Sequence, residues 1–260
     1  MKIYGCQLDI AWENKPANFA KVRRLVEGAR PPRGSLIVLP EMFATGFSMN
    51  AGDLAEGSAA PAETFLADLA RSFDLFVMGG VINVGPDGRG RNEAVTFDPR
   101  GGLVARYAKM QPFSLGGELD HYTAGDRIVT FDCESMRVAP FVCYDLRFPE
   151  LFRAAMSRDV HLFAVIANWP VKRIAHWITL LQARAIENQA YVIGVNRTGS
   201  DPKHSYNGRS LVVDPHGEIL VDAASDESIF SAEVDLARVL EWRAEFPALR
   251  DRRAEAYSSL

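Results

Sequence analysis

Two kinds of apolar pattern follow one another along the chain, short uninterrupted runs and longer segments with helical spacing. The short runs predict strands that are buried on both faces. They include KIYGCQLDI, LIVLP, LFVMGGVI, RVAPFVC and HLFAVIANW. Between the first two runs, a segment that begins near Pro16 places Phe19, Val22 and Val26 on one helical face, with Asn14 as a possible N-cap.

The order of the predicted elements is similar in the two halves of the chain. Each half reads strand, helix, strand, helix and three strands, with helices over roughly Ala62 to Ser72 and Ala175 to Gln189. A further run, IFSAEVD, precedes a helical tail over about 238–260. This alternation is typical of layered α/β architecture. No Pro/Ser-rich linker separates the halves, so we expect a single domain over residues 1–260, with two facing sheets and outer helices.

Composition and charge restrict the classes of partner. The chain has 260 residues, of which 48% are hydrophobic and 24% charged, and this is ordinary for a globular protein with a sizeable core. A net charge of −4, with no basic run, argues against a nucleic-acid partner. No stretch approaches the roughly 18 apolar residues of a membrane helix, and the N-terminus lacks the features of a signal peptide. We therefore expect neither nucleic-acid nor membrane binding.

The cysteines and histidines form no recognisable metal or disulfide pattern. Cys6, Cys133 and Cys143 are odd in number and widely spaced, so they form neither a disulfide framework nor a CxxC zinc motif. His176 and His204 lack a paired ligand at helical spacing. The glycine-rich turn PDGRGR lacks the strand–glycine–helix context of a nucleotide loop. We expect no metal, no cofactor and a reducing, cytoplasmic setting.

Three predicted strands each end in a different reactive residue: Glu41 after LIVLP, Lys109 after LVARYA and Cys143 after RVAPFV. The carboxyl edge of a sheet is where α/β proteins place their sites. Singly, Glu41 and Lys109 could be solvated strand-end residues and Cys143 a core cysteine. Together they supply a base, an electrophile and a nucleophile, which indicates a thiol hydrolase.

The local sequence around two of these residues predicts shifted pKa values. Cys143 lies where a strand breaks into a turn and a helix, and a helix N-terminus lowers the pKa of a thiol. Glu41 follows an apolar strand, and burial there would raise its carboxyl pKa toward the range useful for proton transfer.

Three segments that contain these residues resemble the signature motifs of the nitrilase, or carbon–nitrogen hydrolase, superfamily. They are LPEMFATGF, RYAKMQPF and VCYDLRFPE, and the resemblance extends from the first strand through FSAEVD. It implies a four-layer αββα sandwich with Glu41, Lys109 and Cys143 as a catalytic triad. It also implies a second glutamate in the loop after the lysine strand, and Glu118 fits that position, where it would orient Lys109.

The resemblance and the residue chemistry assign the same roles. Glu41 takes the thiol proton, and Cys143 attacks the amide carbon. Lys109 and the backbone N–H of Tyr144 stabilise the tetrahedral oxyanion. Glu41 then protonates the departing ammonia and activates the water that releases the acid.

The segment ANWPVKRIAHWITLLQARAIENQAYV is most similar to the omega-amidase branch of the superfamily. Members of this branch remove the terminal amide of 2-oxo dicarboxylic acid monoamides such as 2-oxoglutaramate. The carboxylate at the other end of such a substrate needs a cation, and an Arg fork suits it. Arg147 is one candidate, with Lys172 and Arg173 as others. Arg147 could instead form a salt bridge with Glu150 or Asp145.

Further residues are expected to line the pocket or support it. Asn168 and Trp169 end the strand next to the cysteine strand, and Phe43 lies two residues past Glu41. Trp169 and Phe43 could equally be core aromatics. The resemblance suggests that Arg184 and Glu187 support the fold or a dimer, and by resemblance alone we expect a homodimer.

Other functions remain open. Another branch of the superfamily would be an N-carbamoyl amino acid hydrolase, a short aliphatic amidase or a deaminated-glutathione-type amidase. Nitrile hydrolysis is less favoured, because YDLRFPE follows Cys143, where nitrile-cleaving members typically carry a tryptophan–glutamate pair. A non-catalytic binding protein is a different class, and the complete set of reactive residues argues against it.

Overall fold

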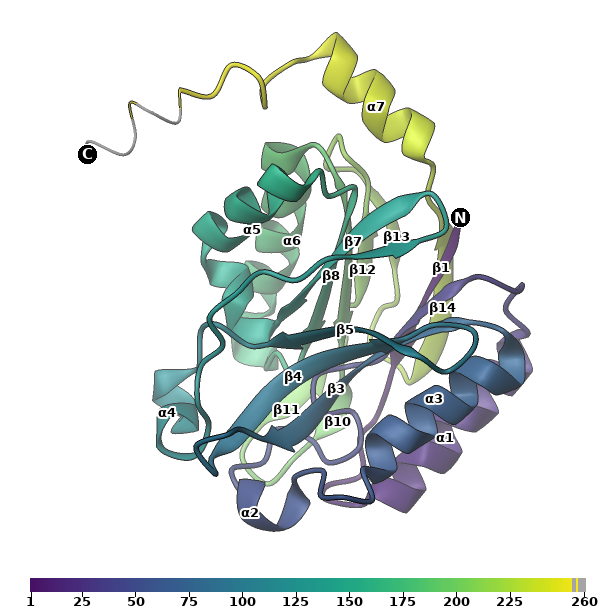
Figure 1. Cartoon of the computed structure of the whole chain (residues 1–260), viewed down its shortest axis with the longest axis vertical. Coiled ribbons are helices and arrows are strands. Elements are labelled where there is room, and N and C mark those ends of the chain that lie inside the picture. Colours follow the sequence, from purple (N-terminus) through teal and green to yellow (C-terminus); the bar gives the residue numbers. More distant parts are fainter. Residues whose placement is uncertain (254–255, 257–260) are drawn as a thin grey trace.

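Two six-stranded sheets face each other in the computed structural model, which describes residues 1–253 and 256 (Figure 1). The first sheet contains β1 (Lys2–Gln7), β2 (Leu36–Val38), β3 (Phe76–Val84), β4 (Gly90–Phe97), β5 (Leu103–Ala108) and β14 (Ser228–Glu233). The second contains β6 (Phe131–Cys133), β7 (Met136–Val142), β8 (Leu162–Ala167), β9 (Tyr191–Asn196), β12 (Leu211–Val213) and β13 (Ile219–Asp222). The strand orders are β14-β1-β2-β3-β4-β5 and β13-β12-β9-β8-β7-β6.

Helices cover the outer faces of both sheets (Figure 1). α1 (Lys15–Ala29) and α3 (Pro61–Phe73) pack on the first sheet, and α5 (Pro149–Ala155) and α6 (Ile174–Asn188) pack on the second. The predicted four-layer αββα sandwich is therefore confirmed. The remaining helical elements are α2 (Ala51–Leu54), α4 (Glu118–His121), α7 (Leu236–Glu245), η1 (Ser114–Gly116), η2 (Cys143–Arg147), η3 (Met156–Arg158) and η4 (Val171–Arg173).

The uninterrupted apolar runs arise because each strand packs on two faces. In β2, Leu36 and Val38 belong to the core between the sheets, whereas Ile37 packs with the core beneath α1 and α3. Each such side chain contributes about 1.5–3 kcal/mol when fully buried. α1 begins as predicted, because Asn14 Oδ1 accepts a hydrogen bond from the Ala17 N–H at 3.1 Å.

Several elements differ from the predicted order. The run IFSAEVD leaves the second half and becomes β14, which pairs antiparallel with β1, with Lys2 opposite Glu233. The loop that was expected after the lysine strand contains η1 and α4. A hairpin of β10 (Thr198–Ser200) and β11 (Ser205–Asn207) follows β9. These short elements have too few residues for a periodic pattern to reveal them.

The C-terminal tail begins with α7, which Figure 1 shows at one end of the molecule. Residues 254–255 and 257–260 of the predicted tail lie outside the described residues. Within the described part, no helix is both long and apolar enough to cross a membrane. The expectation of a single domain over 1–260 stays a prediction.

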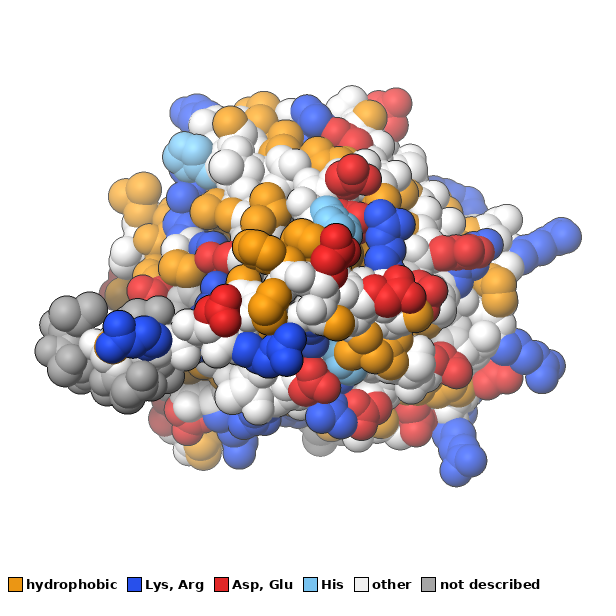
Figure 2. Space-filling view, turned by 90° about the horizontal axis from the view of Figure 1, so that it is seen from above, with side chains coloured by type: hydrophobic (Ala, Val, Ile, Leu, Met, Phe, Trp, Pro, Cys, Tyr) orange, Lys and Arg blue, Asp and Glu red, His pale blue; other side chains and the backbone are white. Residues whose placement is uncertain are grey.

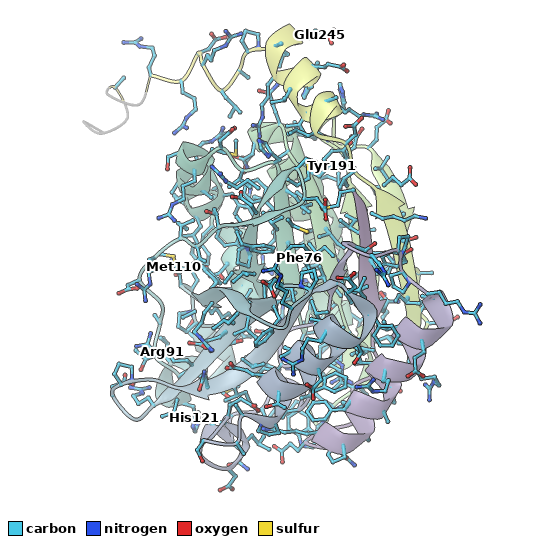
Figure 3. The ribbon with its side chains drawn as sticks, turned by 45° about the vertical axis from the view of Figure 1, so that its right-hand side comes forward. Phe76, Arg91, Met110, His121, Tyr191 and Glu245 are labelled. Carbon is cyan, nitrogen blue, oxygen red and sulfur yellow. The ribbon has the colours of Figure 1, made fainter. Side chains whose placement is uncertain are left out.

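Strand direction brings the ends of β2 and β5 to one edge of the first sheet. β1, β2 and β3 are parallel, and β4 is antiparallel to both β3 and β5, so β5 runs in the same direction as β2. From this edge the chain continues past Met110 and along the side of the molecule to His121 (Figure 3), and the following Tyr122 forms a bridge with Gly90 of β4. The reactive residues that follow β2 and β5 therefore lie close together.

Candidate active site

Lys109 bridges two buried carboxylates at this edge. Its Nζ lies 3.1 Å from Glu41 Oε1 and 2.8 Å from Glu118 Oε2. Both glutamates are 0% exposed and Lys109 is 2% exposed. Glu41, Lys109 and Glu118, predicted from three separate segments, are thus held in one cluster.

Asn92 of β4 completes the cluster, although no sequence pattern indicated it. Its Nδ2 donates to Glu41 Oε1 at 2.7 Å and to Glu118 Oε1 at 2.8 Å. The residue follows the polar turn before β4, where an asparagine is unremarkable in sequence. We call Glu41, Lys109, Glu118 and Asn92 the buried centre.

The turn that carries Glu41 packs tightly against β3 and β8. The Asn168 backbone N–H donates to Glu41 Oε2 at 2.9 Å, and Asn168 Nδ2 donates to the Glu41 carbonyl at 2.7 Å. A Cβ on Gly80 of β3 would lie 2.4 Å from the Met42 backbone nitrogen. Only glycine therefore permits this close approach.

The loop after Lys109 is fixed by Glu118 itself. Glu118 Oε2 accepts a hydrogen bond from the Phe113 N–H at 2.6 Å as well as from Lys109. Farther along, the Gly125 N–H donates to the Lys109 carbonyl at 2.8 Å. Glu118 therefore orients the ammonium and also closes the loop around it.

Cys143 faces this centre from the end of β7. It is the first residue of η2, and its φ of 47° lies in the left-handed region that non-glycine residues seldom adopt. Its pKa is raised well above the ordinary value of a thiol, first by burial and then by the negative charge of Glu41. The expectation of a lowered thiol pKa was therefore wrong, because these two effects outweigh the helix N-terminus.

The pKa of Glu41 also departs from the expectation. Burial raises it, but the charge of Lys109 and hydrogen bonds from Asn92 and Asn168 outweigh burial and hold the pKa below its ordinary value. Burial likewise lowers the pKa of Lys109, and the charges of Glu118 and Glu41 outweigh it, so the net shift is upward. Near neutral pH the cluster therefore combines an ionised glutamate, a charged lysine and a neutral thiol.

A cavity of about 300 Å³ opens above Cys143. Its floor contains Glu41, Lys109 and Cys143, and its walls are mainly aromatic and apolar. The wall residues are Trp12, Phe47, Met49, Phe113, Leu115, Tyr144, Trp169, Pro170 and Tyr206. A site of this size and lining suits a small organic molecule.

Three cations besides the buried Lys109 line the cavity, and we call them the mouth cations because they are less buried than Lys109: Arg147, Arg173 and Lys203. The Arg147 guanidinium lies 4.6 Å from the Trp169 ring centre, and its Nη1 lies 3.3 Å from His176 Nδ1. Burial, followed by the charge of Arg173, lowers the pKa of Arg147. These contacts hold the guanidinium in place and leave donors for a ligand.

The alternative salt bridge of Arg147 is not formed. Over residues 1–253 and 256, no ion pair joins Arg147 to Glu150 or Asp145. Asp145 instead accepts hydrogen bonds from Tyr107 and from two backbone N–H groups. Lys172, another candidate, is exposed and does not line the cavity.

Phe43 does not form a wall of the cavity, so that expectation was wrong. Its ring is buried beneath α1 and α3, with ring centres 6.0 Å from Phe19 and 6.1 Å from Phe65. Met42, with a φ of 45°, turns the chain between Glu41 and Phe43 and directs the ring into the core. Phe43 is therefore a core aromatic, which is the alternative stated from the sequence.

The other predicted binding residues lie at the cavity. Tyr144, Asn168 and Trp169 line it, and the Trp169 Nε1–H donates to the Arg173 carbonyl at 2.8 Å. Trp169 is also packed in the core, so it is both a pocket residue and a core aromatic.

Arg184 lies behind the cavity rather than in it. Its Nε and Nη2 donate to the Leu146 carbonyl of η2 at 3.1 and 2.7 Å, and its Nη1 lies 3.0 Å from Glu187. Arg184 therefore supports the turn that follows Cys143. His121 is exposed on α4.

Sequence reasoning missed the residues of the β10–β11 hairpin. Lys203 and Tyr206 reach the cavity from this hairpin, far along the chain from the three motifs. The turn residues Asp201 and Pro202 were the only local signal, and they indicate a turn without indicating a site.

Among the residues the structure describes, no group of three or more His, Cys, Asp or Glu could hold a metal ion.

The chain as a whole is similar to known proteins. A family model described as carbon-nitrogen hydrolase matches residues 5–244. The chain is 39% identical over 257 residues to the omega-amidase YafV of Yersinia enterocolitica, covering 96% of both chains. It is 31% identical over 252 residues to the 2-oxoglutaramate amidase of Bacillus subtilis, covering 96% of this chain and 97% of the relative. Among solved structures, XC1258 of Xanthomonas campestris, a CN-hydrolase superfamily protein, superposes with a TM-score of 0.92 at 33% identity and covers 97% of both chains.

Proposed function

The chain belongs to the carbon–nitrogen hydrolase family, and we propose that it hydrolyses the terminal amide of a small 2-oxo dicarboxylic acid monoamide, of the 2-oxoglutaramate type. It is a hydrolase that acts on carbon–nitrogen bonds. One observation carries the choice of reaction: a thiol faces a buried glutamate and lysine at the floor of a cavity. The relatives that carry the names omega-amidase and 2-oxoglutaramate amidase support the choice of substrate.

The first half of the reaction forms an acyl-enzyme. Cys143 Sγ bonds to the amide carbon while its proton passes to Glu41, and the carbonyl π electrons move onto oxygen. Lys109 and the backbone N–H of Tyr144 stabilise this oxyanion. Tyr144 is the second residue of η2, where backbone N–H groups have no acceptor within the helix. When the oxyanion collapses, the carbon–nitrogen bond breaks, Glu41 returns the proton to nitrogen, and ammonia leaves.

The second half releases the acid. Glu41 takes a proton from water as the water oxygen attacks the thioester carbon. The carbon–sulfur bond then breaks, the proton returns to sulfur, and the dicarboxylic acid leaves. The enzyme regains its neutral thiol and ionised Glu41.

The pKa shifts support this proton path. The pKa of the thiol is raised, so Cys143 keeps its proton until a substrate carbonyl is in place. The pKa of Glu41 is lowered, so the base is ready across the neutral range. Glu118 helps to keep Lys109 charged, because its carboxylate raises the pKa of that lysine.

Arg147 is the cation that we assign to the substrate carboxylate. Its guanidinium lies against Trp169 and has no acidic partner among the residues described here. A planar fork binds both oxygens of a carboxylate through two parallel N–H bonds, whereas an ammonium group acts as a point charge without this fixed geometry. Arg173 also lines the cavity and stacks on Phe113 instead of Trp169, so it adds positive charge without competing for the stacking position of Arg147.

A panel of amides tests the proposal through ammonia release. We expect 2-oxoglutaramate to be hydrolysed with the highest kcat/KM, a neutral primary amide of equal length more slowly, and N-carbamoyl amino acids hardly at all. The matched neutral amide isolates the contribution of the carboxylate. Turnover of carbamoyl amino acids without turnover of 2-oxoglutaramate would overturn the choice of substrate and leave the thiol mechanism intact.

A homodimer belongs to the same proposal. Figure 2, which views the end that carries α7, shows apolar side chains gathered near the middle of this face. Two large apolar side chains with high exposure lie on α6 and directly after α7, Ile186 at 54% and Phe246 at 55%. Exposed apolar groups of this size favour a protein partner, and a second copy is the simplest. Sedimentation of the wild type and of Phe246→Glu tests this, since a monomeric wild type contradicts it.

We also propose a cytoplasmic location. Cys6, Cys133 and Cys143 are free thiols, and a thiol nucleophile stays usable where the environment is reducing. Amidase activity measured in separated cell fractions tests this part of the proposal.

A further inference from the structure

Asp145 is a buried carboxylate that the reaction steps above do not use. It is 0% exposed and lies two residues after Cys143 in η2. No ion pair joins it to a cation within the described part of the chain; three hydrogen bonds compensate its burial. A buried charge without a counterion is costly, so its contacts indicate what it contributes.

The three hydrogen bonds join the nucleophile turn to the lysine strand. Asp145 Oδ2 accepts from the Val142 N–H at 3.0 Å and from the Tyr107 O–H at 2.8 Å. Asp145 Oδ1 accepts from the Gln111 N–H at 2.9 Å. Val142 directly precedes Cys143, whereas Tyr107 and Gln111 lie two residues before and two residues after Lys109.

The conformation of Cys143 requires such support. A φ of 47° is unfavourable for a residue with a side chain, and it persists only when the surroundings determine it. Cys143 and Lys109 also come from different sheets, so no strand pairing fixes the distance between them. Both groups must meet one carbonyl, and a small displacement of either costs rate.

We propose that Asp145 is a positioning residue that holds the Cys143 turn in register with Lys109. The carboxylate acts through its three hydrogen bonds and does not touch the substrate. This inference rests on the proposed thiol mechanism and extends it to a residue outside the buried centre.

The protonation of Asp145 offers a specific signature. Burial raises its pKa to about 7, against hydrogen bonds from Val142, Tyr107 and Gln111 and the charge of Lys109. The other titratable or charged residues of η2 are Cys143, Tyr144 and Arg147. Arg184 binds the η2 backbone from α6, and His176 of the same helix contacts Arg147. The charge of Glu41 acts on Cys143.

The ionised form is therefore lost as the pH falls below neutrality. Each oxygen of the ionised Asp145 accepts at least one hydrogen bond. Protonation adds a hydrogen to one of these oxygens, so that oxygen is a poorer acceptor and the turn loosens. The pKa of Glu41 is lowered, so the base itself stays ionised in this pH range. An acid limb near pH 7 then belongs to Asp145.

The experiment compares Asp145→Asn with Asp214→Asn in the full chain. Asp214 is the control, since it is also buried and accepts two backbone N–H bonds, but it lies in the turn between β12 and β13 and also pairs with Arg238 at 2.8 Å. We expect Asp145→Asn to lower kcat about 100-fold and to change KM less than about threefold, as for a misplaced reactive group. Asp214→Asn should keep the kcat of its folded fraction.

A second readout does not depend on amide turnover. The rate at which iodoacetamide alkylates Cys143 is followed from pH 5 to 9, with Cys6 and Cys133 buried. We expect an inflection near pH 7 in the wild type that is absent in Asp145→Asn. This profile tests Asp145 even if 2-oxoglutaramate is not the substrate.

Tyr107→Phe is a second variant that tests the role of Asp145 if Asp145→Asn does not fold. The phenyl ring fits the same site against Phe141, and only one hydrogen bond to Asp145 is lost. We expect a three- to tenfold lower kcat, on the order of one hydrogen bond, and an inflection at higher pH. The proposal is overturned if Tyr107→Phe matches the wild type in both readouts. It is equally overturned if Asp145→Asn loses activity only in proportion to unfolding, as Asp214→Asn does.

Discussion

The buried centre and the mouth cations are both charged, but they differ in how their charges are satisfied. In the buried centre, Lys109 meets Glu41 and Glu118, and Asn92 donates to both carboxylates. At the mouth, Arg147 has no acidic partner within residues 1–253 and 256. Satisfied charges fix a geometry, and unsatisfied charges leave bonding capacity for a ligand.

This difference assigns the two regions different roles: the buried centre carries out the reaction, and the mouth cations select the substrate. Removing ionised groups from water costs several kcal/mol per ion before their attraction compensates it, so a buried ionic cluster is weak as a device for stability. Its presence at the floor of a cavity indicates a role in the chemistry. The mouth cations remain partly hydrated and can be exchanged with less effect on the fold.

The largest effect is expected where the centre meets the substrate. Cys143→Ala should lower kcat at least about 10⁴-fold, as loss of a nucleophile does. Its free energy of unfolding should change by less than about 1 kcal/mol, because the substitution removes a single atom that lines the cavity. Cys6→Ala is the matched control, since Cys6 is a buried core thiol whose replacement should leave kcat unchanged. Turnover that survives in Cys143→Ala would exclude the thiol mechanism.

Lys109→Met tests whether the centre holds its charges together. Without the ammonium, Glu41 and Glu118 face each other in a buried site, and we expect a loss of about 3–5 kcal/mol in the free energy of unfolding together with a kcat about 10³-fold lower. Urea unfolding and ammonia release measure the two effects.

The control for this variant is Arg106→Met, which breaks a similar bridge on the helix-covered face of the same sheet. Arg106 lies 2.8 Å from Glu63 and 2.6 Å from Glu93. It should lose stability and keep its kcat. Equal losses of kcat in the two variants would mean that the comparison between the regions is wrong.

At the mouth, Arg147→Met should change binding rather than chemistry. Loss of a charge-assisted hydrogen bond of about 1.5–3 kcal/mol raises KM for a carboxylate substrate roughly ten- to 100-fold. For a neutral amide of equal length, KM should stay within about twofold. Lys172→Met, on an exposed side chain outside the cavity, is the control. A lower kcat at unchanged KM would mean that Arg147 acts in the chemical step, as the residues of the buried centre do.

The pH dependence of stability sharpens the comparison further. The pKa of Glu41 is lower in the folded state than its ordinary value, so its ionisation stabilises the fold above that ordinary value. This contribution is lost as the pH falls through the folded pKa. The difference in unfolding free energy between wild type and Glu41→Gln should therefore shrink below about pH 4.3. Urea titrations at pH 7, 5 and 3.5 measure it, and a constant difference would contradict the prediction.

The smallest effect is expected at Phe43, which belongs to neither region. Phe43→Leu should cost less than about 1.5 kcal/mol in unfolding free energy, as a near volume-conserving core change. kcat and KM should be unchanged, because the ring lies beneath α1 and α3. A raised KM would mean that the ring does reach the ligand.

The sequence predicted residues that end long apolar strands and missed those that depend on tertiary approach. Glu41, Lys109 and Cys143 stand out because each interrupts an apolar run. Asn92 does not, since its importance comes from lying between two carboxylates that are distant in sequence. A local sequence pattern does not reveal such a tertiary contact.

The same limit applies to direction and to charge. The sequence places Phe43 near Glu41 but does not reveal the left-handed turn at Met42 that points the ring away. It predicts a helix N-terminus for Cys143, but burial and the charge of Glu41 decide the pKa of the thiol. Both depend on neighbours that are far away along the chain.

The pairing of β14 with β1 has a consequence for synthesis. Residues 2–7 lie between β2 and β14, and the second partner, residues 228–233, is translated after almost all of the rest of the fold. Until then, one edge of β1 stays unpaired, and unpaired strand edges template aggregation. Closing so distant a contact is also slow. Completion of the first sheet during translation therefore depends on emergence of β14 from the ribosome, and chaperones that shield nascent strands would act in that interval.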